Sequence, residues 1–311
     1  MTASPSAATP DRIAGALRAT ASARGGTPAR DWFSTGASVG DRFSSRALDA
    51  LLGTACPAGS SPIARFRAAC GFVLASWARM WAARRSRRGL GALPRGADVT
   101  VLRTWAHSGA FGADGFSDPY FRGLAGWLAA RDRRVVNVVG ALSERADVYR
   151  AAAGAVDRPV LPEHAFLRLG DPLVVAWQTL RARPRAAAAA FEGHDVTALL
   201  QAAIDEEHAR RQVFANRLQA RIAARIAERT APGLVVLTHE GYAWERQFVF
   251  GVRGAVPAAW VVGYQHAPIT PGATALFATD GLAPREAGLP DRIVTSGRAA
   301  AGELVRRGYP A

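Results

Sequence analysis

Three short apolar runs in the last quarter of the chain set the pattern of hydrophobic and polar positions. They cover residues 234–237, 259–262 and 292–294, they are rich in Val and Ile, and each stops abruptly at a polar, aromatic or glycine-containing turn. Helical sequence follows the first and the third run. This pattern predicts parallel β-strands whose carboxyl ends carry the working residues of an α/β sheet.

The middle of the chain extends the same pattern, because apolar strand-like runs alternate there with amphipathic helical stretches. The predicted elements are strands at 98–105, 134–139 and 159–161 and helices at 119–130, 143–153, 171–182 and 195–229. The first two strands and the helix between them predict a right-handed crossover unit. We therefore expect a Rossmann-like parallel sheet flanked by helices.

The amino-terminal third differs from this pattern. Residues 1–38 are rich in Ala, Ser, Thr and Pro and lack the continuous apolar core of a secretory signal, which predicts a disordered tail. Helices expected at 41–53 and 63–88 make residues 39–96 a helical preface. Residues 97–311 form the predicted Rossmann-like α/β domain.

Polar and aromatic residues follow the predicted strands directly. In an open α/β sheet, ligands bind in the crevice beyond the carboxyl ends of the strands. We therefore expect these side chains to face one common cleft. They are Glu240, Tyr242, Trp244, Glu245, Gln265, His266 and Ser296.

Three motifs give this region a family resemblance. They are Glu-Gly-Tyr-Ala-Trp-Glu at 240–245, Gly-Tyr-Gln-His at 263–266 with Pro268 and Pro271 behind it, and Pro-Asp-Arg-Ile-Val-Thr-Ser-Gly at 290–297. In this order they resemble the end of the amino-terminal lobe of GT-B glycosyltransferases that build bacterial surface polysaccharides such as capsule and lipopolysaccharide.

The resemblance implies a division of labour between two lobes. The amino-terminal lobe of such enzymes binds the acceptor, a glycan or a lipid-linked saccharide, and a second Rossmann-like lobe binds the nucleotide sugar. The chain stops where the crossover to that donor lobe would begin, so we expect a fragment or a lobe that acts with a partner. We expect no sugar transfer by the 311-residue chain alone.

Glycosyl transfer with inversion needs a general base for the acceptor hydroxyl, and His266 is the first candidate. It follows a buried-type strand and precedes a proline-stiffened loop, although a histidine that only orders this loop fits the same pattern. Glu240 is a further catalytic candidate. It is placed to bind sugar hydroxyls while Tyr242 or Trp244 stacks on a pyranose. The alternatives are that the aromatic rings close the end of the sheet and that Glu245 serves only the helix dipole.

The glycine-rich loop at 106–119 supplies further candidates for the acceptor site. The GT-B resemblance implies that the loop after the first strand contributes to the acceptor site, which makes His107 and Asp114 the second choice for a catalytic base. We count Trp105 and Ser108 among the substrate-binding residues. The glycines allow the backbone to approach a ligand, but loops of this kind often only turn the chain.

Backbone N–H groups at Ser296 and Gly297 suit a phosphate or sugar oxygen, because a helix begins there. An ordinary helix N-cap explains the same two residues.

The net charge of +14 does not by itself indicate nucleic-acid binding. All 39 basic residues are Arg and none is Lys, which is typical of codon bias in a GC-rich genome. Without a nucleic-acid motif, we expect no nucleic-acid partner. The charge still favours contact with anionic lipids or phosphates.

An arginine-rich, tryptophan-containing stretch at 65–88 has two interpretations. It is a helix that packs on the core and exposes a basic end, or a helix that lies on an anionic membrane surface. The second interpretation leaves open an alternative function, a non-catalytic glycan- or membrane-binding module.

No pattern in the chain requires a cofactor or a metal. The sequence has no GxGxxG after its first strand, no P-loop motif and no Cys/His zinc spacing. The acidic cluster at 205–208 fits a solvated helix face with ion pairs. Two cysteines and the absence of a 20-residue apolar span predict a cytoplasmic protein, peripheral to the inner membrane if it contacts one.

Overall fold

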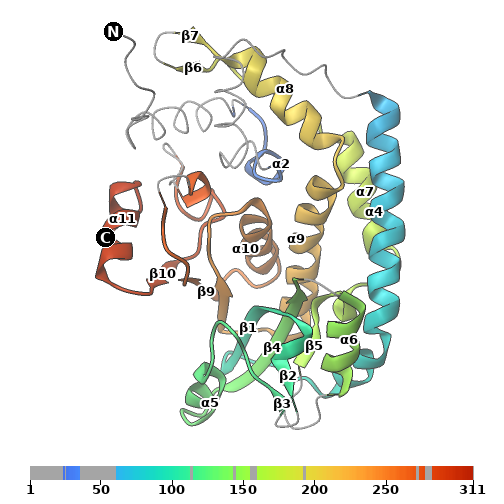
Figure 1. Cartoon of the computed structure of the whole chain (residues 1–311), viewed down its shortest axis with the longest axis vertical. Helices are drawn as coiled ribbons and strands as arrows, with labels where there is room; N and C mark the ends of the chain where they lie inside the picture. The colour runs from blue at the N-terminus through green and yellow to red at the C-terminus, as the bar shows by residue number, and fades with distance from the viewer. Residues whose placement is uncertain are drawn as a thin grey trace.

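A parallel β-sheet forms the centre of the protein in the computed structural model, which describes residues 24, 26–35, 61–112, 115–142, 145–154, 160–191, 194–270, 273–276 and 282–310 (Figure 1). Within these ranges six strands pair in the order β10-β9-β8-β1-β4-β5. Their bounds are β1 Val99–Ala106, β4 Arg134–Ala141, β5 Val160–Pro162, β8 Leu234–Thr238, β9 Trp260–Gln265 and β10 Arg292–Thr295.

The strand order confirms the predicted Rossmann-like α/β fold. The chain builds β1, β4 and β5 outward in one direction, then returns to place β8, β9 and β10 on the other side of β1. Every neighbouring pair is parallel, and β1 pairs with both β4 and β8. The order therefore reverses between β1 and β8, which is where such sheets open a crevice for ligands.

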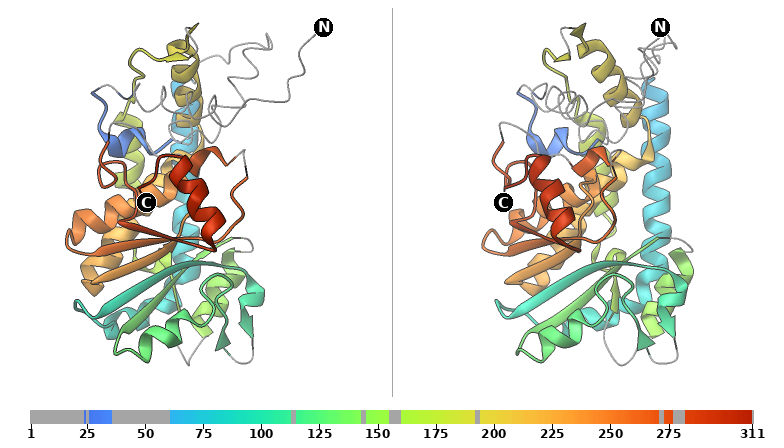
Figure 2. Two further views of the ribbon diagram at one scale, coloured as in Figure 1. Left: turned by 90° about the vertical axis from the view of Figure 1, so that its left-hand side faces the viewer. Right: turned by 60° about the vertical axis from the view of Figure 1, so that its left-hand side comes forward.

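Helices cover the two faces of the sheet unequally. Figure 2 shows α5 on one side of the sheet, and α9 with α10 on the other. The helices are α2 Ala29–Trp32, α4 Pro62–Ala82, α5 Leu124–Ala129, α6 Arg145–Gly154, α7 Asp171–Arg181, α8 Thr197–His208, α9 Arg211–Thr230, α10 Ala243–Ala255 and α11 Arg298–Arg306. The described chain also contains 3-10 segments, η2 Ala83–Ala92, η3 Ser108–Ala110, η4 Glu163–Phe166 and η5 Thr274–Leu276. Two short antiparallel hairpins complete it. One pairs β2 Phe111–Gly112 with β3 Gly115–Phe116, and the other pairs β6 Ala190–Phe191 with β7 His194–Asp195.

Alternation of side chains along the strands defines the two faces. Val101 and Val235 belong to the main core beneath α4, α7, α9 and α10. Leu102 and Val236, one position further along each strand, belong to a small cluster with Phe121 and Leu128 at α5. We call the first the helix-covered face and the second the open face, because successive residues of a strand point to opposite sides.

The stretch predicted as a long helix at 195–229 contains two helices, α8 and α9. A short break after His208 separates them, and α9 ends where Ala231 takes a left-handed conformation, with φ 42°, just before Pro232. Gly251 lets α10 pack closely on α9, since a Cβ atom there would lie 2.1 Å from the carbonyl oxygen of Ala220.

The first long helix begins as its sequence predicts. Ser61 accepts a hydrogen bond from the backbone N–H of Ala64, and Pro62 occupies the first helical position. The helix predicted at 63–88 is α4 followed by the 3-10 segment η2. The helix predicted at 41–53 lies outside the described residues.

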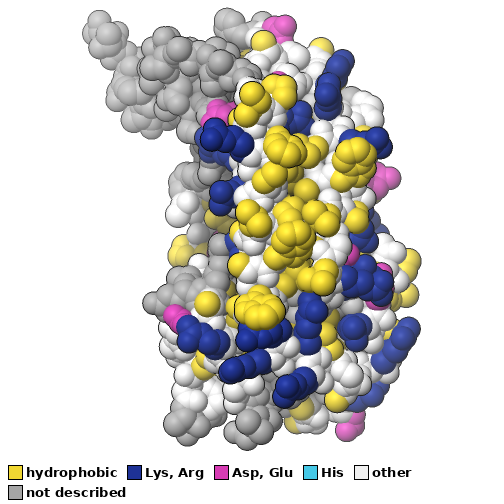
Figure 3. Space-filling model, turned by 90° about the vertical axis from the view of Figure 1, so that its right-hand side faces the viewer, with side chains coloured by type: hydrophobic (Ala, Val, Ile, Leu, Met, Phe, Trp, Pro, Cys, Tyr) yellow, Lys and Arg dark blue, Asp and Glu magenta, His cyan; other side chains and the backbone are white. Residues whose placement is uncertain are grey.

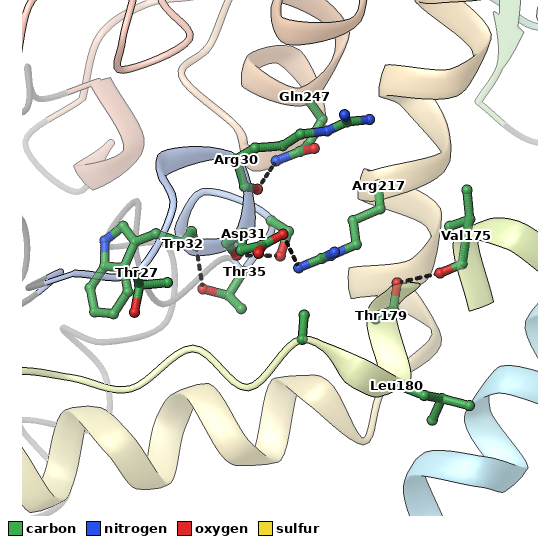
Figure 4. A network of polar contacts seen from close by, with 12 residues as sticks. Thr27, Arg30, Asp31, Trp32, Thr35, Val175, Thr179, Leu180, Arg217 and Gln247 are labelled. Atoms are coloured by element: carbon green, nitrogen blue, oxygen red, sulfur yellow. Dashed lines mark hydrogen bonds and ion pairs between the residues drawn. The ribbon is translucent and has the colours of Figure 1, made fainter. Parts of the chain in front are cut away.

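Residues 26–35 fall within the predicted disordered tail, but they are packed into the protein (Figure 4). Trp32 and Phe33 are fully buried. Asp31 forms an ion pair of 2.9 Å with Arg217 of α9, and the Gln247 amide of α10 donates to the carbonyl of Arg30 at 2.7 Å. The disorder prediction is therefore wrong for this segment, because its two aromatic side chains bury apolar surface that the polar composition around them hides.

Candidate functional site

The carboxyl edge of the sheet carries polar groups on both faces, so the predicted single cleft is divided into two sites. Trp105 extends the helix-covered face of β1 and contacts Trp244, with ring centroids 5.0 Å apart. Glu240 and His266 follow β8 and β9 on the open face, where His266 shares a hollow with Val236. The sheet separates the two groups because strand side chains alternate.

Glu240 and His266 form a pair at the open face. His266 Nε2 lies 3.5 Å from Glu240 Oε1, and the side chains are 23% and 30% exposed. The Tyr120 ring meets the imidazole edge-on, at a centroid distance of 4.6 Å. Burial and the negative charge of Glu245 raise the pKa of Glu240, opposed by His266 and by a hydrogen bond from Tyr242. The two side chains are therefore close enough to form an ion pair when the imidazole is protonated.

The turn that presents Glu240 is held by Glu245 at the start of α10. Its buried carboxylate accepts the backbone N–H of Glu240 at 2.9 Å and of Gly241 at 2.7 Å, and lies 3.2 Å from His239 Nδ1. Gly241 has φ 81°, and a Cβ atom there would lie 2.0 Å from the carbonyl oxygen of Ala275. Glu245, predicted to bind substrate, is thus a positioning residue.

A hollow of about 720 Å³, which we call the His266 hollow, opens beside the pair. Its wall combines the bare part of the open sheet face with the segment after Asp118 and with α5. The lining includes Pro119, Tyr120, Phe121, Trp127, Leu128, Val236, Val262, Tyr264, His266 and Val294. Apolar and aromatic walls with a few polar groups at one end are typical of small-molecule sites.

Asp118 fixes the position of Tyr120. Its Oδ1 accepts hydrogen bonds from the Thr104 hydroxyl at 3.0 Å and from the backbone N–H groups of Tyr120 at 2.8 Å and Phe121 at 2.9 Å. Burial raises the pKa of Asp118 although these three hydrogen bonds oppose the effect. The loop after β1 therefore reaches the site through Tyr120.

On the helix-covered face, a polar cavity of about 390 Å³ lies over the ends of the strands. We call it the Trp105 pocket. Its lining includes Phe72, Arg79, Trp105, Tyr149, Glu163, His164, Arg211, Asn216, Gln219 and Trp244.

The floor of the Trp105 pocket contains a buried ion pair. The Arg103 guanidinium donates to Glu163 at 2.8 Å and lies against the rings of both Trp105 and Trp244, at 3.8 and 4.2 Å from their centroids. Gln219 donates to the second oxygen of Glu163 at 3.1 Å. Burial acts to raise the pKa of Glu163, but Arg103 overcomes it and holds that pKa below its usual range. This carboxylate stays charged.

The remaining predicted site residues lie apart from the Glu240–His266 pair. His107 is exposed at the end of β1 and lines neither cavity. Gln265 is fully buried and donates its amide to the carbonyl of Ala267, so it braces the loop and offers no surface to a ligand.

The structure does not test the roles of four further predicted residues, Ser108, Asp114, Ser296 and Gly297. Ser108 begins the short 3-10 turn η3. Asp114 lies outside the described residues. Ser296 and Gly297 are exposed at the end of the outer strand β10, where α11 begins without a side-chain cap. The roles assigned to these residues stay predictions.

Sequence reasoning missed the polar network of the Trp105 pocket. Arg103 was the available signal, because an arginine inside an otherwise apolar strand must find a buried partner. That partner, Glu163, and the Tyr149–His164 hydrogen bond of 2.7 Å come from segments 15 to 60 residues away in sequence. No local pattern links them.

No family profile, curated protein or solved structure matches this chain. Within the described ranges, no group of three or more His, Cys, Asp or Glu side chains could hold a metal ion. The site must therefore be interpreted from its own geometry.

Proposed function

We propose that this protein is the acceptor-binding lobe of a glycosyltransferase of surface carbohydrate biosynthesis, with the Glu240–His266 pair as its proton acceptor. The observation that carries the proposal is that His266, in the wall of the aromatic His266 hollow, lies 3.5 Å from the Glu240 carboxylate. A nucleotide-sugar donor would be held by a second lobe, as the sequence resemblance implies.

The chemistry assigns a role to each member of the pair. The acceptor hydroxyl attacks the anomeric carbon of the donor, the bond to the nucleotide phosphate breaks, and the hydroxyl proton passes to the His266 imidazole. The Glu240 carboxylate stabilises the imidazolium that forms, as an orienting carboxylate does for other catalytic histidines. Glu245 holds the Glu240 turn in place and has no contact with the reacting atoms in this scheme.

The walls of the His266 hollow suit a saccharide. Tyr120 and Tyr264 supply aromatic faces on which the apolar side of a pyranose can stack, and the polar end meets its hydroxyl groups. A site with this composition favours an uncharged sugar over a phosphate, because the hollow's lining has one cationic side chain, Arg122, among the described residues.

The proposal is tested by saccharide binding to the full chain. Saturation-transfer NMR with methyl glycosides of glucose, galactose, mannose, rhamnose and N-acetylglucosamine identifies a binding sugar, and calorimetry gives its affinity. We expect His266→Asn to weaken that affinity roughly tenfold, the cost of one lost hydrogen bond to a charged or polar group. Glu286→Gln, at an exposed carboxylate, is the matched control and should bind like the wild type.

A non-catalytic glycan-binding module is the second candidate, and an amino analogue of the bound sugar separates the two. Replacing the reacting hydroxyl by an amino group places an ammonium ion against the His266 imidazole, near the Glu240 carboxylate. A proton-accepting site should bind the analogue roughly tenfold more tightly than the sugar, and Glu240→Gln should abolish the preference. Equal affinity for both ligands supports the module, and no saccharide binding at all rejects both candidates.

A further inference from the structure

The outer surface of α4 and α7 exposes a continuous group of large apolar side chains (Figure 3). We call it the α4–α7 surface. Its members on α4 are Ile63, Phe66, Leu74, Trp77 and Trp81, and those on or next to α7 are Leu169, Leu173, Val174 and Trp177. Soluble monomers rarely leave so many large apolar residues together in water, and such patches mark interaction sites.

Core packing and hydrogen bonds hold α4 and α7 in place. Their inner faces pack into the main core through residues such as Phe72 and Val175. The Trp77 indole donates to the carbonyl of Leu169 at 3.0 Å, and Arg65 donates to the carbonyl of Leu180 at 3.2 Å. The exposed residues therefore do not collapse onto a neighbouring element of the fold.

Arginines surround the apolar residues, and acidic side chains are nearly absent. Over residues 61–92 and 167–183, all of them described, the single carboxylate is Asp171, which is buried and hydrogen-bonded to Arg225. The exposed arginines over the same two stretches are Arg67, Arg84, Arg85, Arg88, Arg168, Arg181 and Arg183. Figure 3 shows basic side chains beside apolar ones on this face of the molecule.

Tryptophan and arginine are paired on this surface. The Arg84 guanidinium lies 4.1 Å from the centroid of Trp81, and Arg181 lies 4.1 Å from that of Trp177. Tryptophan prefers the boundary between lipid headgroups and acyl chains, and arginine reaches from the same depth to lipid phosphates. An arginine-rich polar rim around a Trp, Phe and Leu face is the composition of segments that lie in a membrane interface.

We propose that the α4–α7 surface docks the protein onto a bilayer that contains anionic lipid. Charge complementarity decides the occupant, because a second copy of the chain would bring arginine against arginine. No helix in the described part of the chain has the length and apolarity to cross a bilayer. The surface therefore lies on the membrane, and the interaction is independent of the saccharide site.

Vesicle co-sedimentation of the full chain tests this proposal. We expect binding to vesicles of phosphatidylcholine with phosphatidylglycerol, little binding to phosphatidylcholine alone, and a loss of binding as salt screens the charges. Trp81→Ser with Trp177→Ser should weaken binding by roughly tenfold or more, because each indole loses its apolar contact with lipid. Arg84→Gln, Arg85→Gln and Arg88→Gln together should weaken it by roughly a hundredfold.

Matched variants elsewhere on the molecule provide the controls. Trp260 is 51% exposed on β9, comparable with Trp177 at 57%, and Arg292 is exposed on β10. Trp260→Ser and Arg292→Gln should bind vesicles like the wild type, with thermal unfolding confirming that every variant is folded. Equal effects of test and control variants, binding that ignores lipid charge, or a dimer that Trp81→Ser and Trp177→Ser dissociate would each overturn the proposal.

Discussion

Two glutamates stand at the carboxyl edge of the same sheet, on opposite faces, and their surroundings give them opposite behaviour. Glu163 is buried against the Arg103 guanidinium, which holds its pKa low. Glu240 is partly exposed, its ion-pair partner is the imidazole of His266, and burial together with Glu245 raises its pKa. The permanent charge of arginine favours the anionic form of the first carboxylate, whereas the second carboxylate has no arginine partner of this kind.

The difference between the two carboxylate pairs suggests a structural role for the pair on the helix-covered face and a role in ligand binding for the pair on the open face. A fully desolvated charge pair is costly to form and more costly to break, so it favours one arrangement of the chain. A half-exposed pair without arginine stabilises little, but its protonation state can respond to a ligand. We therefore expect the Arg103–Glu163 pair to hold the floor of the Trp105 pocket in one arrangement. We expect the Glu240–His266 pair beside the His266 hollow to change its protonation when a ligand binds.

Breaking the buried Arg103–Glu163 ion pair should have the largest effect on the free energy of unfolding. Arg103→Met removes the cation but keeps a side chain against the two indoles, and it leaves Glu163 buried without its arginine counter-ion. We expect the free energy of unfolding to fall by about 3–5 kcal/mol, measured by urea denaturation. Adding Glu163→Gln should restore part of the loss. Additive losses in the double variant would show that the two side chains do not act as a pair.

Two buried or half-buried tyrosines allow a second, smaller comparison. The Tyr149 hydroxyl is bonded to His164 Nδ1 at 2.7 Å beside the Trp105 pocket, whereas Tyr120 contacts His266 through its ring. Tyr149→Phe should lower the free energy of unfolding by about 1–2 kcal/mol, because the buried hydrogen bond between the Tyr149 hydroxyl and the His164 ring is lost. Tyr120→Phe keeps the ring and should change it by less than about 0.5 kcal/mol. Thermal unfolding of both variants checks the contrast, and equal losses would contradict it.

The fold was largely readable from the sequence because parallel strands buried on both faces are continuous apolar runs. The runs at 234–237 and 134–139 correspond to β8 and β4, and their spacing by helical sequence predicts the crossover topology. The packing of the segment at 26–35 was not predicted from the sequence, because Trp32 and Phe33 are two apolar residues within a polar stretch. Their burial depends on α8, α10 and α11, which local composition does not report.

The site was readable only in part. Position after a strand placed Glu240 and His266 together, since the ends of neighbouring parallel strands meet at one edge. The same rule wrongly grouped Trp244 with them, because a helix that follows a strand turns its side chains toward either face. The Arg103–Glu163 pair joins β1 to the turn after β5, and such long-range partners follow from topology and not from spacing.

The smallest predicted effect has a sign that separates the two glutamates. A carboxyl whose pKa is raised on folding holds its proton more tightly in the folded state, so stability falls as pH rises from the unfolded to the folded pKa. Glu240→Gln removes this cost. We expect the variant to equal the wild type below the ordinary glutamate pKa and to be slightly more stable, by less than about 0.5 kcal/mol, at neutral pH.

Glu163→Gln should show the opposite dependence on pH, which makes the pair of variants a test independent of any ligand. Its folded pKa is lowered, so its charge stabilises the protein above the unfolded pKa, and the contribution is lost as pH falls through the folded value. The stability difference between wild type and Glu163→Gln should therefore shrink in acid, whereas that of Glu240→Gln grows toward neutral pH. Denaturant midpoints measured across pH, with a variant of the exposed Glu286, Glu286→Gln, as the control for a surface substitution, give both slopes. A Glu240→Gln protein less stable than the wild type at neutral pH would mean that the charge of Glu240 stabilises the fold, and it would contradict the raised pKa of this carboxyl.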